Sequence, residues 1–560
     1  MRIHLALLIC LLCAVPSRAA RAAGPVAPNA GAMLQQLQPA AATGAAPTEP
    51  RLTVQEKPDA PVPPGMAFRV TTIAITGNTR IATQELHALV QDAEGQDLTL
   101  AALSAVVARI TAHYQHKGFA LARAIVPGQT ITDGVLQVQV IEARYDAVLL
   151  DNQTPLRDAL LRSALAGLQT GQVIQQAPLD DALLSLADIP GVVVNATMQP
   201  GSGPGLTDLV VRTTAPGARV SGNTVIDNYG SDLVGSTRAG QTLRLLDPFQ
   251  QQTGAALELS GLSAGAGLNY ARIAYETVLN GAARRVGGAY SALQYTVGGP
   301  LAASGSRGDA QAGQLWARHS LLRSYAANLY AQVQYDHTQL SDHLGRDTDS
   351  NRDTDKLTAS LTGDFQDALG LGAVNNWNLS LSSGVATYGN AADPLEHAAR
   401  AEGSFTKLNG AFTRLQQLTP ADSLYAALTL QWASRNLDAS EKMALGGAST
   451  VRALTASALS GDLGVLLTLE YRHTLGAQWG SGNWQGTVFL DCASVQLNKS
   501  ALGSSGNFVQ VRGAGVGLAW SGLHHFYVKA QLATQVGTPP AALAGETDAL
   551  RAWVEIAHSF

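Results

Sequence analysis

The chain has 560 residues, of which 46% are hydrophobic and 14% are charged, with a mean hydropathy of +0.06 and a net charge of −5. The small negative charge gives no electrostatic basis for nucleic-acid binding. Soluble domains carry roughly 25% charged residues, and helical membrane proteins are more hydrophobic than this chain. A β-barrel with one lipid-facing and one wet face produces this intermediate composition.

The first 22 residues have the pattern of a secretory signal peptide. Arg2 supplies the positive start, residues 5–15 form a short apolar stretch, and residues 20–22 offer an A-x-A cleavage site. The apolar stretch is too short to cross a bilayer as a helix. An uncleaved N-terminal anchor is the alternative interpretation.

The residue types that bind metals or cofactors form no recognisable site. Cys10 and Cys13 lie in the signal segment, so the mature chain keeps only Cys492 and has no internal disulfide. His524 and His525 are adjacent, and neighbours on a strand point to opposite faces. The Gly-rich stretches lack a P-loop lysine, and no G-x-S-x-G segment with suitable His and Asp partners stands out. The sequence therefore predicts no metal, no cofactor and no catalytic residue.

Residues 23–66 are rich in Ala, Pro, Gln and Gly. Within them, residues 32–38 predict a two-turn helix with Leu34 and Leu37 on one face. The prolines that follow predict an extended linker.

Two consecutive segments have the same predicted order, β-α-α-β-β. In the first module, residues 67–143, Thr83 and Thr99 are candidate helix N-caps. Its predicted elements are a strand at 68–75, helices at 83–91 and 102–116, and strands at 119–126 and 134–141. The second module, residues 144–214, has a strand at 145–150, helices at 155–168 and 178–186, and strands at 192–198 and 206–213. The repetition predicts a tandem pair of α+β modules.

From residue 215 to residue 560 the helical pattern is replaced by segments of about ten residues that alternate apolar and polar side chains. The polar face contains Arg, Glu and Asp, which suits a water-filled lumen, and the chain ends on Phe560 after an amphipathic segment. We predict an antiparallel transmembrane barrel of sixteen strands, with starts near residues 217, 237, 254, 267, 285, 309, 324, 354, 372, 402, 421, 461, 482, 508, 523 and 548.

Several motifs in this frame resemble those of the two-partner secretion transporters, which export haemolysins, filamentous haemagglutinins and haem-binding exoproteins. The similarity covers nearly the whole mature chain. In the first module, which resembles a polypeptide-transport-associated (POTRA) domain, the matching residues are Tyr114, Gly118, Pro127, Gln129 and Gly134. The segment 228–230 with Gly235 is similar to the first barrel strands of the family, and residues 34–37 are similar to its lumenal plug helix.

The most specific resemblance lies in two barrel motifs. One is a long loop that folds back into the barrel, with Gly446 and Gly447 before a tip formed by Val451, Arg452, Ala453 and Leu454. The other is the strand that receives the tip, with Phe489, Asp491 and Ala493, and Asp462, Gly464 and Glu470 stand at the family's spacing between the two. Ala453, Leu454 and Ala493 depart from the family pattern, which has glycine, an aromatic residue and glycine there. The resemblance implies that Arg452 pairs with Asp491, and the added methyl groups predict a looser fit of the tip.

The resemblance also implies a function. An unfolded exoprotein with an N-terminal secretion domain would bind the modules in the periplasm by β-augmentation and leave through the barrel without nucleotide. Outer-membrane lipid and the barrel-assembly machinery are the other implied partners, and no nucleic acid is expected. Two alternatives stay open: a barrel-assembly insertase of the same superfamily, and an outer-membrane barrel enzyme such as a protease or lipase.

Overall fold

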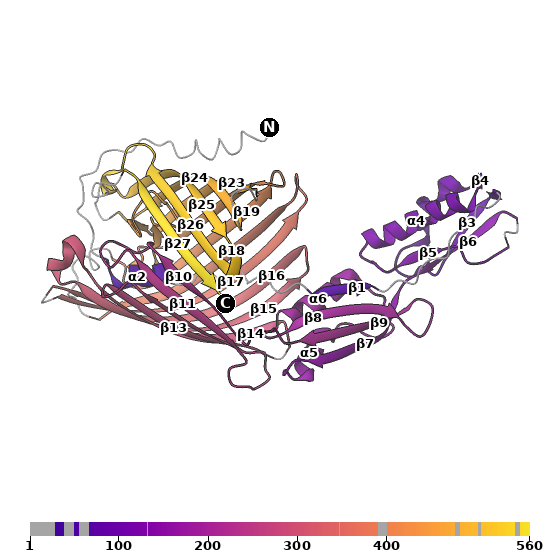
Figure 1. Cartoon of the computed structure of the whole chain (residues 1–560), viewed down its shortest axis with the longest axis horizontal. Coiled ribbons are helices and arrows are strands. Elements are labelled where there is room, and N and C mark those ends of the chain that lie inside the picture. The colour runs from indigo at the N-terminus through magenta and orange to yellow at the C-terminus, as the bar shows by residue number, and fades with distance from the viewer. Residues whose placement is uncertain are drawn as a thin grey trace.

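The computed structural model describes residues 28–37, 50–54, 67–130, 133–279, 281–345, 348–389, 400–476, 482–501, 506–543 and 549–560. A closed β-barrel forms one part of the molecule, and two small modules extend from it in a row (Figure 1). The helix α2 (Ala30–Leu37) lies inside the barrel, against its wall. The predicted signal segment and most of the predicted linker lie outside the described residues.

The first module packs two helices against a small sheet with the order β3-β6-β5. The predicted first strand is divided, because its initial part pairs with β4 in a separate two-stranded sheet. Thr99 caps α4 as predicted, accepting a hydrogen bond from the backbone N–H of Ala102, whereas Thr83 does not cap α3 and its hydroxyl is engaged by Asn78. The elements are β2 (Phe68–Val70), β3 (Thr72–Thr76), α3 (Thr83–Ala88), η1 (Gln91–Ala93), β4 (Gln96–Leu98), α4 (Leu100–His116), β5 (Arg123–Ile125) and β6 (Val135–Ile141).

The second module has the same order of elements around its own apolar core. They are β7 (Arg144–Gln153), α5 (Asp158–Leu165), α6 (Gln176–Ala187), β8 (Val193–Pro200) and β9 (Leu206–Thr214). A strand from the predicted linker, β1 (Arg51–Val54), pairs in parallel with β8, so that the sheet has the order β1-β8-β9-β7.

The barrel has sixteen antiparallel strands, and β27 closes it by pairing with β10. The predicted starts agree to within three residues except that of β17, which begins at Thr348 instead of near 354. The strands are β10 (Val220–Asp227), β11 (Arg238–Leu246), β12 (Ala256–Ser263), β13 (Leu268–Val278), β14 (Arg284–Thr296), β15 (Arg307–Arg323), β16 (Ala327–Leu344), β17 (Thr348–Asp367), β18 (Ala373–Tyr388), β19 (Gly403–Gln417), β20 (Asp422–Ala433), β23 (Leu463–Leu475), β24 (Asn483–Gln496), β25 (Phe508–Ser521), β26 (Phe526–Gln535) and β27 (Arg551–Ser559).

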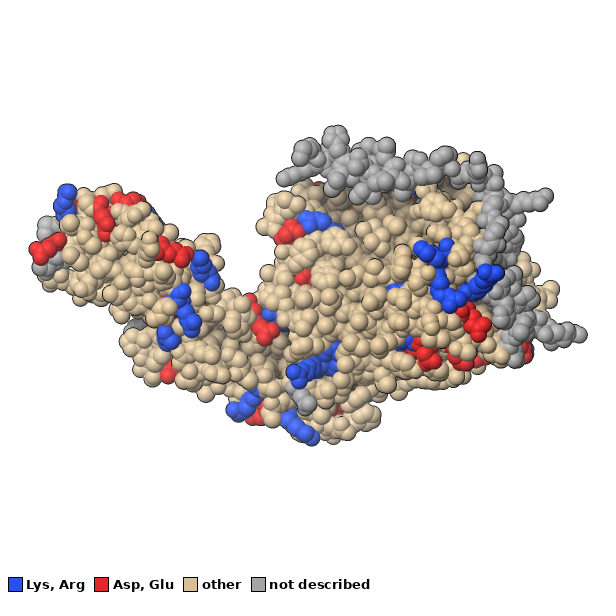
Figure 2. Space-filling view, turned by 180° about the vertical axis from the view of Figure 1, so that it is seen from behind, with Lys and Arg blue, Asp and Glu red and all other residues tan. Residues whose placement is uncertain are grey.

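The outer wall of the barrel is apolar. Exposed aliphatic and aromatic side chains recur at alternate positions of the strands, including Val333, Leu357, Leu381, Leu430 and Val516. Figure 2 shows few charged side chains over the broad middle of this wall. Such alternation gives each strand a lipid-facing side and a lumenal side. In the described part of the chain, no helix has the length and hydropathy needed to span a bilayer.

Candidate functional site

A long loop between β20 and β23 turns back into the lumen, and its tip is buried. Its stem is a hairpin of β21 (Met443–Leu445) and β22 (Leu459–Gly461). Gly446 lies at the end of the stem with a φ of +107°, and a Cβ atom there would lie 2.1 Å from the carbonyl oxygen of Thr455. Only glycine fits both constraints. The adjacent Gly447 also has a positive φ, and the tip residues are Val451, Arg452, Ala453 and Leu454.

The Arg452 side chain is the centre of a buried ionic cluster. Its Nε and Nη2 atoms donate to the two carboxylate oxygens of Asp491 at 2.9 and 2.7 Å, and its backbone N–H donates to the same group at 3.1 Å. Nη1 donates to Glu470 at 2.6 Å. The guanidinium also stacks on Phe489, 3.4 Å from the ring centroid. The structure therefore brings Arg452 and Asp491 together, and Glu470 is a second partner.

The loop tip packs closely against the wall, contrary to the predicted looser fit. Asp491 is fully buried, Arg452 is 3% exposed, and Ala453 packs with Phe489 and Ala533. The methyl group of Ala453 is accommodated because the facing wall residue is Gly513, where a Cβ atom would lie only 2.8 Å from it. Ala493 joins the apolar cluster that also contains Val451 and Leu454.

The tip is also joined to the seam where the barrel closes. Trp553 on β27 donates its indole N–H to the carbonyl oxygen of Arg452 at 2.8 Å. Its ring packs edge-on against Tyr229, and Asn228 bonds the backbone of β27 on both sides of Trp553. Sequence reasoning did not assign Trp553, although a large aromatic residue on the polar face of the last strand is a visible signal.

The other motif residues of the barrel hold the loop at its base. Asp462 accepts hydrogen bonds from the backbone of Leu437 and Lys499 and pairs with Lys442 at 3.3 Å. Gly464 lies directly against Met443 of the stem, and a Cβ atom at this position would be 2.5 Å from the methionine sulfur.

Phe560 exchanges two backbone hydrogen bonds of 2.9 Å with Gly222 at the end of the barrel ladder, and its side chain is exposed.

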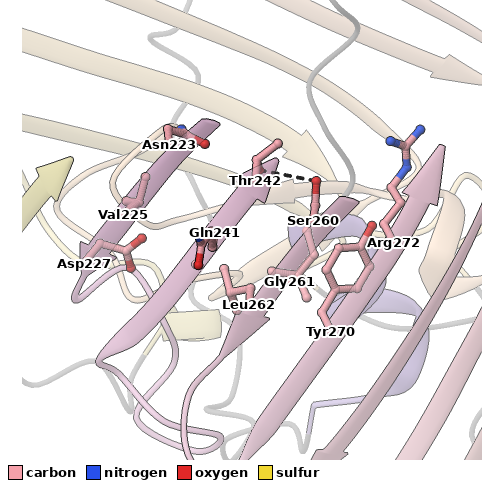
Figure 3. Close-up of a pocket in the computed structure, with 12 residues that line it drawn as sticks. Asn223, Val225, Asp227, Gln241, Thr242, Ser260, Gly261, Leu262, Tyr270 and Arg272 are labelled. Carbon is pink, nitrogen blue, oxygen red and sulfur yellow. Dashed lines mark hydrogen bonds between the residues drawn. The ribbon is translucent and has the colours of Figure 1, made fainter. Parts of the chain in front are cut away.

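The helix α2 occupies the lumen beside a cavity. Leu34 is buried against the wall, and Leu37 is half-buried at the edge of the same apolar cluster. A cavity of about 270 Å³ lies beyond Leu37, between the helix and the strands β10 to β13. Figure 3 shows that both polar side chains, such as Thr242 and Ser260, and apolar ones, such as Val225 and Leu262, line it. The lumen therefore keeps open space next to the helix.

The motif residues of the first module do not contact the ionic cluster around Arg452. They shape the module instead. Tyr114 is buried, packs edge-on against Phe119 and donates to Glu142 at 2.9 Å. Burial would raise the pKa of the Glu142 carboxyl, but hydrogen bonds from Thr79, Arg80 and Tyr114 outweigh it and hold the pKa below its ordinary value.

The remaining motif residues of this module surround its last two strands. Gln129 bonds the backbone N–H and carbonyl of Gln137 on β6, at 2.8 and 2.7 Å, and its amide also lies 3.4 Å from the carbonyl oxygen of Pro127. Gly118 follows the end of α4, and Gly134 precedes β6. Pro127, Gln129 and Gly134 therefore lie in the connection between β5 and β6, next to the central strand of the sheet.

The second module is fastened to the barrel. Asp188, at the end of α6, forms a two-pronged ion pair of 2.7 Å with Arg323, the last residue of β15. Its backbone carbonyl accepts a hydrogen bond from Arg285. Because Arg323 is 4% exposed, this buried contact fixes the module to the ends of the wall strands β14 and β15.

Comparison with known proteins agrees with this architecture. Residues 68–143 match the model of the ShlB-type POTRA domain, and residues 205–520 match that of the haemolysin secretion/activation protein ShlB/FhaC/HecB. The chain is 26% identical over 430 residues to the heme/hemopexin transporter protein HuxB of Haemophilus influenzae, covering 73% of each chain. It is 24% identical over 469 residues to the outer membrane transporter CdiB of Escherichia coli, covering 82% of this chain and 78% of CdiB.

A solved structure shows the same fold. CdiB from Escherichia coli superposes with a TM-score of 0.68 at 22% sequence identity, over 90% of this chain and 93% of that one.

A sixteen-stranded outer-membrane barrel with an inward loop, a lumenal helix and periplasmic modules defines a polypeptide-transporting barrel. The chain belongs to the haemolysin secretion/activation family ShlB/FhaC/HecB. It is thus an outer-membrane transporter of two-partner secretion, which exports an exoprotein, with its barrel in the outer membrane and its modules in the periplasm. The members of this family are transporters and not enzymes.

Proposed function

We propose that the transporter binds its exoprotein as an unfolded chain, through the sheet edges of its periplasmic modules. Extended peptides add to an exposed sheet edge by backbone hydrogen bonds, which make few demands on sequence. We divide the chain for this role into a signal peptide (1–22), a plug and linker (23–66), two modules (67–143 and 144–214) and a barrel (215–560). The partner is a large exoprotein with an N-terminal secretion domain.

The pairing of β1 with β8 is the observation that carries this proposal. Residues Arg51 to Val54 run parallel to Asn195 to Met198, and all four side chains of β1 are exposed. The strand is therefore held mainly by its backbone ladder, since its apolar side chains Leu52 and Val54 stay 37% and 40% exposed. Because β1 follows the lumenal helix α2 in the chain, an exoprotein strand that displaced it would also free the tether of the plug.

At rest, in this proposal, the lumen is obstructed twice. The helix α2 fills one side, and the loop tip with Arg452 is bound to the opposite wall. Binding of the exoprotein releases the helix, the chain passes outward, and its folding outside supplies direction. Phe560 acts earlier, during assembly of the barrel, by completing the ladder of the last strand.

A disulfide between β1 and β8 tests this mechanism. Thr53 and Thr197 are paired across the two strands, so cysteines there can be joined in a background carrying Cys492→Ser. We expect the oxidised transporter to stop secreting its exoprotein and to resume after reduction. Cysteines at the already paired Asn195 and Arg212 of β8 and β9 form the control, which should secrete in both states. Normal secretion by the oxidised Thr53–Thr197 variant would rule out displacement of β1.

A further inference from the structure

A short turn at the base of the inward loop lies between the plug helix and the barrel wall. We call residues 437–442, which include the 3-10 helix η3 (Ala439–Glu441), the loop base. The plug approaches it closely at Gly31, where a Cβ atom would lie 2.7 Å from the backbone nitrogen of Ser440. Gln35 donates to the backbone carbonyl of Lys442. The plug therefore rests on the loop base along its length.

The first turn of the plug is bound by a wall carboxylate. The backbone N–H of Ala30 donates to Asp342 on β16 at 2.8 Å, and Tyr295 donates to the same oxygen at 2.6 Å. Tyr295 also lies 3.1 Å from the carbonyl oxygen of Pro28, just before the helix. A carboxylate at a helix N-terminus satisfies a free N–H group and favours the helix dipole.

One arginine links this carboxylate to the loop base. Arg352 on β17 donates to Asp342 with one terminal nitrogen and to Asp438 with the other, the latter at 2.9 Å. The side chains of Arg352 and Asp438 are both fully buried. Asp438 in turn accepts hydrogen bonds from the backbone and hydroxyl of Ser440, the residue that faces Gly31. A continuous chain of contacts thus runs from the plug through the wall to the loop.

A second ionic group fixes the loop base to the wall. Glu441 pairs with Lys356 on β17 at 2.8 Å and with Lys407 on β19 at 2.6 Å. Gln431 on β20 donates to its backbone carbonyl at 3.1 Å. The loop base is consequently held from both sides, so it presents a fixed surface to the plug.

We propose that the loop base is a latch for the plug, with Gly31 and Arg352 as its positioning residues. Arg352 pairs both with the carboxylate of Asp342, which binds the start of the plug, and with the carboxylate of Asp438 in the loop base. The plug detaches from the loop base when Arg352 loses one of its two carboxylate partners. Release of the plug and movement of the inward loop are therefore coupled. The latch rests on the proposed role of α2 as a resting plug.

The latch and simple apolar packing predict opposite effects at Gly31. If only the contacts of Ala30, Met33 and Leu34 with the wall held the plug, Gly31→Ala would stabilise the helix and tighten it, because alanine is the better helix former. With the latch, the added methyl group collides with backbone atoms of Ser440 and pushes the plug off the loop base.

The test measures single-molecule ion currents of the full-length transporter in planar bilayers. We expect Gly31→Ala to raise the fraction of time spent conducting by about tenfold, as for a tenfold shift in a two-state equilibrium. Gly313→Ala on β15 is the matched control, because a Cβ there meets no atom within 4 Å, and its current should equal that of the wild type. A current that is unchanged or lower in Gly31→Ala would overturn the latch.

Arg352→Lys tests the shared arginine. A lysine keeps the charge but lacks the planar fork that reaches two carboxylates at once, so we again expect a rise of about tenfold. Arg414→Lys is the control, since Arg414 also forms an ion pair in the barrel, with Asp367 at 2.7 Å, but has no contact with the plug or loop base among the described residues. Heat-modifiability confirms a folded barrel in each variant. Equal currents in Arg352→Lys and Arg414→Lys would contradict the coupling.

Deletion of residues 28–37 separates the latch from the plug itself. If the deletion leaves the current unchanged, α2 is not a plug and the proposed function fails with the latch. If the deletion raises the current while Gly31→Ala and Arg352→Lys do not, the plug is real and only the latch is wrong. The latch predicts increases in all three.

Discussion

Two buried arginines of the lumen have similar surroundings, but one lies on the inward loop and the other on a wall strand. Arg452 belongs to the loop, and both its carboxylate partners, Glu470 and Asp491, belong to wall strands. Arg352 belongs to the wall, and one of its partners, Asp438, belongs to the loop. In both clusters one arginine binds two carboxylates, and in the Arg452 cluster Glu470 is also bound by Arg472 at 2.6 Å. Loss of Arg352 leaves two buried carboxylates uncompensated. Loss of Arg452 leaves the fully buried Asp491 uncompensated, while Glu470 keeps its ion pair with Arg472. Loss of one carboxylate still leaves each arginine with the other carboxylate. The arginine is therefore the sensitive member of each cluster.

The largest effect is expected for Arg452→Ala. Removal of one partner from a buried ionic group typically costs about 3–5 kcal/mol, and the 3% exposure of Arg452 favours this full range over the roughly 0–1 kcal/mol of exposed pairs. The barrel ladder does not depend on the loop, so secretion should fall much more than membrane insertion. Secreted exoprotein and heat-modifiability of the barrel are measured together. Glu470→Gln should be clearly milder, and an equal loss in both variants would contradict the asymmetry.

A charge reversal sharpens the comparison. Exchanging the pair as Arg452→Asp with Asp491→Arg places the new carboxylate of residue 452 next to Glu470. In the wild type Glu470 lies 2.6 Å from Arg452. We therefore expect little recovery of secretion from the exchange alone. Adding Glu470→Gln removes the repulsion and should restore part of the loss. Full recovery by the two-residue exchange without the Glu470 change would mean that Glu470 has no role in the cluster.

The sequence predicted the barrel well because alternation is a local signal. It was weakest at β17, where the outward side chains near the start are Asp349, Asn351 and Asp353, so apolar alternation disappears while the ladder continues. The strand β1 gave no signal of pairing, since four exposed residues carry no burial pattern. The pairing of Arg452 with Asp491 was expected from the resemblance. The room that Gly513 leaves for the methyl group of Ala453 was not expected, because these two segments meet only in the folded barrel.

A smaller effect is expected at Trp553, which fixes the backbone of Arg452 without touching its charge. Trp553→Phe keeps an aromatic ring against Tyr229 but removes the indole hydrogen bond of 2.8 Å. The loss of one such bond typically costs about 1 kcal/mol. Secretion should fall by a factor of less than about ten, well below the loss in Arg452→Ala. A loss as large as that of Arg452→Ala would show that the seam, and not the ion cluster, holds the loop.

The smallest effect concerns a buried anion outside the barrel. The pKa of Glu142 is lowered in the folded first module, so its contribution to stability is fully present above its ordinary pKa of 4.5 and is lost as the pH falls through the lowered value. Tyr114→Phe removes one donor and should cost about 0.5–1.5 kcal/mol at neutral pH and less in acid. Hydrogen exchange of the first module, measured in the full-length protein at neutral pH and at acidic pH, checks this. An equal cost at both pH values would contradict the assignment.

We propose that α2 and the loop tip held by Arg452 together close the resting lumen. Ion conductance in planar bilayers tests this most directly, in the wild type, in the deletion of residues 28–37, in Arg452→Ala and in the combined variant. We predict that the deletion raises conductance, and that the combined variant conducts more than either single change. A deletion with the conductance of the wild type would contradict the account.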